Sequence, residues 1–234
     1  MNRVLAVFAL SALIAFQAQA QIPTRDQNYY KIKSVVTKEI TEQNLPSVVV
    51  PNEPADFDLA PAEAEVLDIT SFLSLDAVVN IGKGVWTVVQ AGKPTTDTKF
   101  DTANALPGGA TDWTELEGWG APEFKTFNVQ YKNIYDMTVV DFTYRVMYIA
   151  NGNVKGIGQY LANVTVIPVN LSVAWGFKFN VSAAIPTVTN IGTAQNPLAA
   201  MQVNLRWSAS SFISSEESSR MFYITGDGEF KEIN

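Results

Sequence analysis

Apolar and polar residues alternate with a period of two from about Phe124 to the end of the chain. This period is typical of β-strands that bury one face and expose the other. Strands are therefore expected over 127–131, 140–148, 169–181, 201–207 and 221–225. Their apolar positions include Phe127, Val129 and Tyr131; Val140, Phe142, Tyr144, Val146 and Tyr148; Val169, Leu171, Val173, Trp175, Phe177, Phe179 and Val181; and Met201, Val203, Leu205 and Trp207.

The alternation also predicts where the strands turn or slip. Val164 and Val166 have the opposite parity to the run that begins at Val169, so a β-bulge near Pro168 would keep both halves facing one core. Asn151-Gly152 suits a tight hairpin turn. Asp227-Gly228 is expected to turn the chain toward a last strand over 230–233.

Residues 74–91 have a different pattern. Leu75, Val78, Val79, Val85, Trp86 and Val89 fall on one helical stripe, Ser74 can cap its start, and Gly92 suits its end. We therefore expect a helix over 74–91. Gly82 and Gly84 each weaken a helix by about 1 kcal/mol relative to alanine. They leave a hairpin between Val78–Ile81 and Val85–Val89 as the alternative.

Together these elements predict a mainly β fold, an antiparallel β-sandwich with one α-helix packed on it. The sandwich is expected to occupy residues 61–234, after an irregular, flexible lead-in over 21–60 that four prolines interrupt. The lead-in holds Glu53, Asp56 and Asp58. Their spacing lacks the pattern of a calcium-binding EF-hand, which favours a solvated linker over a metal site.

Residues 1–20 have the three parts of a cleavable signal peptide. Arg3 gives a short positive region, an uncharged apolar stretch runs from Val4 to Phe16, and Ala18-Gln19-Ala20 precedes the expected cut before Gln21. The apolar stretch is shorter than the roughly 20 residues that a transmembrane helix needs. We therefore expect an exported protein.

Composition excludes several kinds of chemistry. The chain has no histidine and no cysteine, so Ser-His-Asp and Cys-His catalysis and the usual zinc sites are ruled out. A cysteine-free exported chain of 234 residues fits a bacterial periplasmic or secreted protein better than a disulfide-rich animal one. The net charge of −7 and the absence of a basic run argue against nucleic acid as a partner.

The segment 111–123 combines two tryptophans with several acids and glycines. Trp113 and Trp119 are the candidate ligand-binding residues, since exposed indoles beside carboxylates are common in carbohydrate sites. The alternative is that both indoles close the end of the core. Glu115, Glu117 and Glu123 are the acids to test for glycosidase chemistry, which depends on a distance between carboxylates.

These observations predict a non-enzymatic, exported bacterial envelope protein that acts by binding or as a structural component. No catalytic residue, metal or cofactor is expected, and the expected partners are other envelope proteins or a surface ligand. Two alternatives remain: a lipid-interacting or oligomeric pore-forming protein with peripheral membrane contact, and a carbohydrate-binding module. The oligomeric state is left open.

Overall fold

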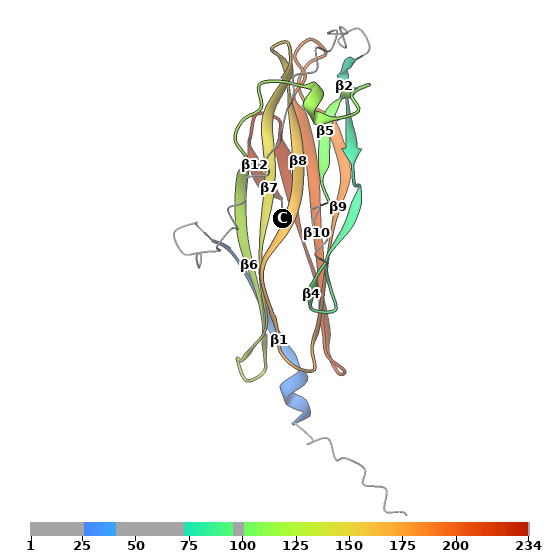
Figure 1. Cartoon of the computed structure of the whole chain (residues 1–234). Coiled ribbons are helices and arrows are strands. Elements are labelled where there is room, and N and C mark those ends of the chain that lie inside the picture. The colour runs from blue at the N-terminus through green and yellow to red at the C-terminus, as the bar shows by residue number, and fades with distance from the viewer. Residues whose placement is uncertain (1–25, 41–72, 96–100, 234) are drawn as a thin grey trace, which may run out of the picture.

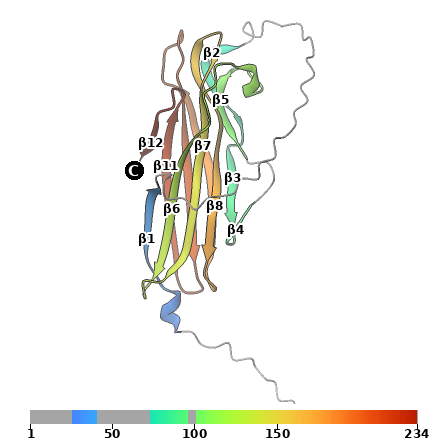
Figure 2. The same cartoon turned by 60° about the vertical axis from the view of Figure 1, so that its left-hand side comes forward.

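Two six-stranded antiparallel sheets pack face to face in the computed structural model, which describes residues 26–40, 73–95 and 101–233 (Figures 1 and 2). The predicted antiparallel β-sandwich is confirmed. The predicted signal peptide and most of the predicted lead-in lie outside the described residues. Each sheet runs along the length of the molecule, so the turns between strands gather at its two ends.

The strand order differs from the chain order in both sheets. The first sheet has the order β1-β6-β7-β8-β5-β2 and the second has the order β12-β11-β10-β9-β3-β4. The elements are η1 (Gln27–Tyr30), β1 (Ile32–Ile40), β2 (Ser74–Gly82), β3 (Val85–Gln90), β4 (Lys93–Pro94), β5 (Ala103–Gly108), η4 (Trp113–Glu115), β6 (Glu123–Asn133), β7 (Thr138–Val154), β8 (Ile157–Val173), β9 (Lys178–Asn190), β10 (Ala199–Ser210), β11 (Ser215–Thr225) and β12 (Phe230–Ile233).

The core lies between the sheets and is built from the apolar parity that the sequence predicts. Phe127 of β6 stacks on Tyr144 of β7 in the first sheet, with ring centroids 5.5 Å apart. It also meets Phe222 of β11 in the second sheet at 4.9 Å. Phe142 meets Phe179 across the sheets at 5.3 Å. Offset and edge-on aromatic pairs of this kind add to the stability gained from burial.

The predicted bulge near Pro168 is confirmed, whereas the predicted turn at Asn151-Gly152 is wrong. Thr143 pairs with Asn170 but Tyr144 pairs with Pro168, so the register skips one residue of β8. Strand β7 continues past Gly152 to Val154, and the chain turns at 155–156 instead. Asn151, with φ of 68°, forms an irregularity inside the strand.

The predicted helix over 74–91 is also wrong, because these residues form strands in two different sheets. β2 pairs with β5 in the first sheet and β3 pairs with β9 in the second. The chain crosses between the sheets at residues 83–84, where the alternative placed a turn, but the two strands do not pair as a hairpin. Gly82 has φ of 129°, and a Cβ there would lie 2.4 Å from the Thr102 carbonyl oxygen. The inward-facing residues of β2 and of β3 lie at different parities along the chain, because the chain changes sheets between the two strands. Taken together, these apolar positions have the spacing of a helical stripe.

Two further boundaries differ from the expectation. The apolar run 169–181 is two strands, since β8 ends at Val173 and β9 begins at Lys178. The lead-in is regular where the structure describes it: β1 pairs with β6 from Ile32 to Ile40. β1 is an edge strand whose side chains are exposed or half-buried, which explains its weak alternation.

Replacing either of two buried tyrosines by phenylalanine is expected to change the free energy of unfolding, in opposite directions. The Tyr144 hydroxyl has no hydrogen-bond partner among the described residues, whereas the Tyr160 hydroxyl donates to the Leu75 carbonyl oxygen at 3.0 Å. Tyr144→Phe is expected to raise the free energy of unfolding by up to about 1 kcal/mol, because it removes an unpaired buried polar group. Tyr160→Phe should lower it by about 1 kcal/mol. Urea unfolding checks both, and equal losses in the two variants would contradict this account.

Candidate binding surface

One end of the sandwich exposes a group of large apolar side chains. Three turns lie there: 134–137 between β6 and β7, 174–177 between β8 and β9, and 211–214 between β10 and β11, beside η1 (Figure 1). We call this group of turns, with η1, the aromatic end. Its exposed fractions are 67% for Trp175, 66% for Phe212, 51% for Met137 and 50% for Tyr135, and Ile134 and Ile213 are also exposed.

Tyr30 of η1 joins the turns beneath these exposed side chains. Its ring is buried and lies 4.3 Å from the ring of Phe212, 6.0 Å from that of Phe177 and 6.3 Å from that of Trp175. Gly176, with φ of 86°, lets the chain pass directly over the Tyr30 ring, where a Cβ would lie 2.4 Å from a ring carbon. The aromatic end is therefore one packed unit.

Hydrogen bonds hold η1 against the same turns. The Tyr30 carbonyl accepts a hydrogen bond from the Ser211 hydroxyl at 2.7 Å, and the Lys31 carbonyl accepts one from the Ile134 amide at 3.2 Å. The Tyr29 carbonyl accepts one from the Asn133 side chain at 3.0 Å. These bonds join η1 to two of the turns, which fixes their relative positions.

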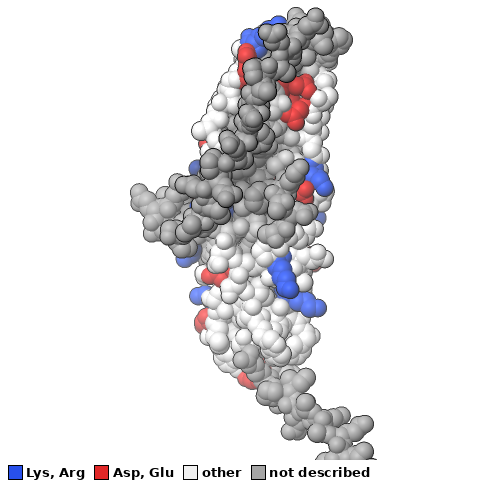
Figure 3. Space-filling model, in the orientation of Figure 1, with Lys and Arg blue, Asp and Glu red and all other residues white. Residues whose placement is uncertain are grey.

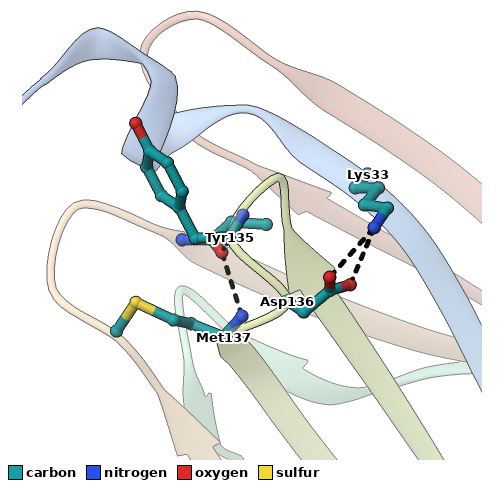
Figure 4. Close-up of polar contacts among 5 residues, drawn as sticks. Lys33, Tyr135, Asp136 and Met137 are labelled. Atoms are coloured by element: carbon teal, nitrogen blue, oxygen red, sulfur yellow. Dashed lines mark hydrogen bonds and ion pairs between the residues drawn. The ribbon is translucent and has the colours of Figure 1, made fainter.

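Hydrogen bonds to Asn133 hold the turn between β6 and β7, whose residues Tyr135, Asp136 and Met137 are shown in Figure 4. The buried Asn133 side-chain oxygen accepts from the amides of Tyr135 at 3.0 Å and Met137 at 3.1 Å. Lys33 on β1 reaches across to Asp136, with 2.9 Å between the Nζ and a carboxylate oxygen. Tyr135 points toward η1, where its hydroxyl donates to Asp26.

Two acids at the aromatic end, Asp26 and Asp136, have partners. The hydrogen bond and charge of Lys33 lower the pKa of Asp136, and the hydrogen bond from Tyr135 lowers the pKa of Asp26. Both carboxylates are therefore ionised near neutral pH and held by neighbours. The lowest part of the described surface in Figure 3 is mostly uncharged.

Sequence reasoning missed the aromatic end. Trp175 is in phase with the buried residues on both sides of it, so the pattern placed it in a core strand. Its signal was Gly176, which follows it directly and takes a backbone conformation suited to a turn. Phe212 and Ile213 lie between Ser211 and Ser214, which bond to each other and close a short turn. The serine- and glutamate-rich residues after them begin β11.

The structure brings the two predicted ligand-binding tryptophans together at the opposite end. Trp113 and Trp119 pack edge to face with centroids 5.9 Å apart, and the Trp119 indole nitrogen donates to the Trp113 carbonyl at 3.2 Å. Both are half-buried against the core. Trp119 lies over Gly152, where a Cβ would come within 2.2 Å of the ring. One face of this indole is therefore used in packing.

Two of the three candidate acids have structural partners. Glu115 completes a capping box with Asp112 at the start of η4 and also accepts from the Thr111 hydroxyl. Glu123 accepts from the Tyr148 hydroxyl at 2.9 Å. Glu117 forms a backbone bridge with Asn153. This arrangement gives Glu115 and Glu123 roles in holding the local fold.

A shallow polar hollow of about 630 Å³ crosses the outer face of the second sheet. Paired positions place one side chain from each of four strands in a row: Thr87, Ser182, Arg206 and Ser219. Asn180 and Ser208 lie beside the row and are 3.5 Å apart. The hollow offers hydrogen bonds and one charge of each sign, from Arg206 and Glu217, and the Trp207 indole that lines it is buried.

The described residues contain no group of three or more acidic side chains suited to hold a metal ion. Within the same ranges, no helix has the length and apolar character needed to cross a bilayer. The chain matches no protein-family model, and no curated protein or solved structure proved similar to it.

Proposed function

We propose that this protein is an exported, non-enzymatic component of a bacterial envelope, and that it acts by binding through its aromatic end. Export is supported by the signal-peptide pattern of residues 1–20. A non-enzymatic role is supported by the lack of histidine and cysteine in the sequence, and by the structural use of Glu115 and Glu123.

The observation that carries the proposal is the exposure of Trp175 and Phe212. Both are about two-thirds exposed, and both rings pack against the ring of Tyr30; Met137, Tyr135 and Ile213 are exposed on turns at the same end of the molecule. Burying the exposed part of either ring would contribute roughly 2–4 kcal/mol to binding. Contiguous apolar patches on soluble proteins usually mark interaction sites, and a packed, pre-formed patch loses little entropy on binding.

The proposal is tested by measuring how much purified protein sediments with isolated bacterial envelope membranes. The test variant carries Trp175→Ser and Phe212→Ser. The control carries Val85→Ser and Ile191→Ser, which remove two apolar side chains that are 69% and 47% exposed elsewhere. We expect the apparent Kd to rise at least tenfold in the test variant and to change less than twofold in the control.

Three outcomes are decisive once circular dichroism and thermal unfolding show that both variants remain folded. A loss confined to the test variant supports the aromatic end as the binding surface. Equal binding by the test variant and the unchanged protein overturns it. A loss in the control alone would place the binding surface elsewhere and also overturn it.

Export is tested separately by mass spectrometry of the protein recovered from an expressing bacterium. The expected N-terminus is Gln21, because Ala18 and Ala20 provide the small residues that signal peptidase requires. The protein should be recovered outside the cytoplasm. Recovery from the cytoplasm with Met1 retained would contradict export.

A further inference from the structure

We propose that the partner of the aromatic end is the surface of a lipid bilayer, into which the tips of the three turns insert. This inference rests on the proposed function, because it names the partner of that same surface. Two kinds of observation carry it, the chemistry of the exposed side chains and the hydrogen bonds within the turns, and the local charge does not oppose it.

The exposed side chains are those that a membrane interface favours. Tryptophan and tyrosine are enriched at the level of lipid headgroups, where one end of the ring meets hydrocarbon and the other meets water. Trp175 and Tyr135 provide these two residue types, and Phe212, Ile213 and Met137 provide purely apolar ones. They come from three separate turns at one extremity of a long molecule, so all can contact one plane (Figures 1 and 2).

Most of the backbone amides at the turn tips already have internal hydrogen-bond partners. The amides of Tyr135 and Met137 donate to the Asn133 side chain, and that of Asp136 donates to the Asn133 carbonyl. In the turn between β10 and β11, the amides of Ile213 and Ser214 donate to the Ser211 hydroxyl at 3.3 and 3.0 Å. A peptide group that enters a poorly hydrated layer needs such a partner, because water is not there to supply one.

The turn between β8 and β9 follows the same rule. The Phe177 amide donates to the Ala174 carbonyl at 3.1 Å, and the Ala174 amide donates to the Val139 carbonyl at 2.8 Å. Phe177 itself is buried against Tyr30, so Trp175 is the side chain that this turn presents outward. The three turns thus combine apolar tips with internal partners for most of their amides, although the amides of Phe212 and Gly176 donate no hydrogen bond within the described part of the chain.

The local charge does not oppose contact with a bilayer. The chain as a whole has a net charge of −7, yet the described residues within three positions of η1 or the turns include four lysines and four acids. They are Lys31, Lys33, Lys132 and Lys178, with Asp26, Asp136, Glu216 and Glu217. Asp136 is paired with Lys33 and Asp26 accepts from Tyr135. Lysine side chains can keep their ammonium groups among headgroups while their stems lie along the apolar layer.

A protein partner would require a surface of complementary shape. Specific protein interfaces match a partner's shape around buried anchors. The exposed rings here sit on projecting turns, which a fluid bilayer can receive without a matching surface. Lipid is therefore the occupant that the geometry favours.

The test is flotation of the full purified protein with two sets of vesicles, one of phosphatidylcholine alone and one with phosphatidylglycerol added. The unchanged protein is expected to float with both sets. Trp175→Ser with Phe212→Ser should lower the partition coefficient at least tenfold. Val85→Ser with Ile191→Ser is the matched control and should change it less than twofold.

The outcomes separate this inference from the proposed function. If the protein binds neither vesicle set but sediments with envelope membranes through its aromatic end, the lipid inference is overturned and the binding function stands. Loss of envelope binding after protease treatment of the membranes would identify a protein partner, with the same consequence. Self-association in sedimentation velocity that the test variant abolishes, without flotation, would replace lipid by a second copy. Flotation that the test variant retains also overturns the inference.

Discussion

Replacing Phe127 by alanine is expected to lower the free energy of unfolding by about 3–5 kcal/mol, the range for removing a buried aromatic ring. Phe127 is buried between the two sheets. Its ring contacts Tyr144 in its own sheet, and Phe222 and Phe230 in the other. The guanidinium of Arg220 also lies 5.6 Å from its centroid. Removal of the ring would leave a cavity between the two sheets and would remove contacts that join them.

Phe124 supplies the matched control for this prediction. It lies on the same strand, β6, but on the outer face, and is partly exposed. Phe124→Ala is expected to cost less than about 1 kcal/mol, the usual limit for a surface substitution with one weak contact. Urea unfolding followed by circular dichroism measures both. Equal losses would show that Phe127 does not hold the sheets together.

Alkaline pH is expected to destabilise the protein, starting near pH 10 and continuing beyond pH 12. Burial raises the pKa of Tyr144, Tyr148 and Tyr160 above the ordinary value of about 10, in the case of Tyr160 to about 12. The fold therefore favours the neutral phenol. Its contribution is complete below pH 10, where the tyrosines of the unfolded chain are also neutral, and is lost as pH rises through the pKa of the folded state.

Tyr144 and Tyr148 should contribute more than Tyr160 to this alkaline loss. The Tyr144 hydroxyl is buried without a hydrogen-bond partner in the described part of the chain, and the nearby charge of Arg220 offsets only part of the cost of burying an ionised oxygen. Each such tyrosine contributes at most about 1.4 kcal/mol per pH unit. Unfolding in urea at pH 8, 10, 11 and 12 gives the slope, which Tyr144→Phe should reduce. A stability that is flat from pH 8 to pH 12 would refute the prediction.

The sheets were predictable from sequence because their strands bury one face. Along β7, the residues from Val140 to Tyr148 that the period of two assigned to the core are all fully buried. The bulge at Pro168 could be predicted because the apolar positions change parity there. In a sheet with one buried face, one extra residue at this point keeps the apolar residues on both sides facing the core.

The crossing at residues 83–84 could not be predicted in the same way. Trp86, Val88 and Val89 are buried while Val85 is exposed, so β3 lacks a clean alternation. Where the chain changes sheets within a short segment, the buried residues before and after the crossing alternate with different parity. The combined spacing of these apolar residues resembles a helical stripe. Only the pairing of β2 with β5 and of β3 with β9 distinguishes the two structures, and pairing depends on residues far away in the sequence.

The aromatic end was hidden for a related reason. Patterns of alternation assume that an apolar residue in phase with its neighbours is buried with them. Trp175 breaks this assumption, because the strand ends at Val173 and the turn carries the indole outward. Trp113 and Trp119, by contrast, pack against each other, and one face of Trp119 lies against Gly152; their role as ligand-binding residues stays a prediction.

The most direct test of the account labels the aromatic end with a dye that responds to its surroundings. The chain has no cysteine, so Ile213→Cys and Ile191→Cys each create a single labelling site, the first at the aromatic end and the second at the opposite end. When envelope membranes are added, the dye at position 213 should shift to shorter wavelength and brighten, while the dye at 191 should not change. No change at 213, or a change only at 191, would contradict the claim that the protein binds through its aromatic end.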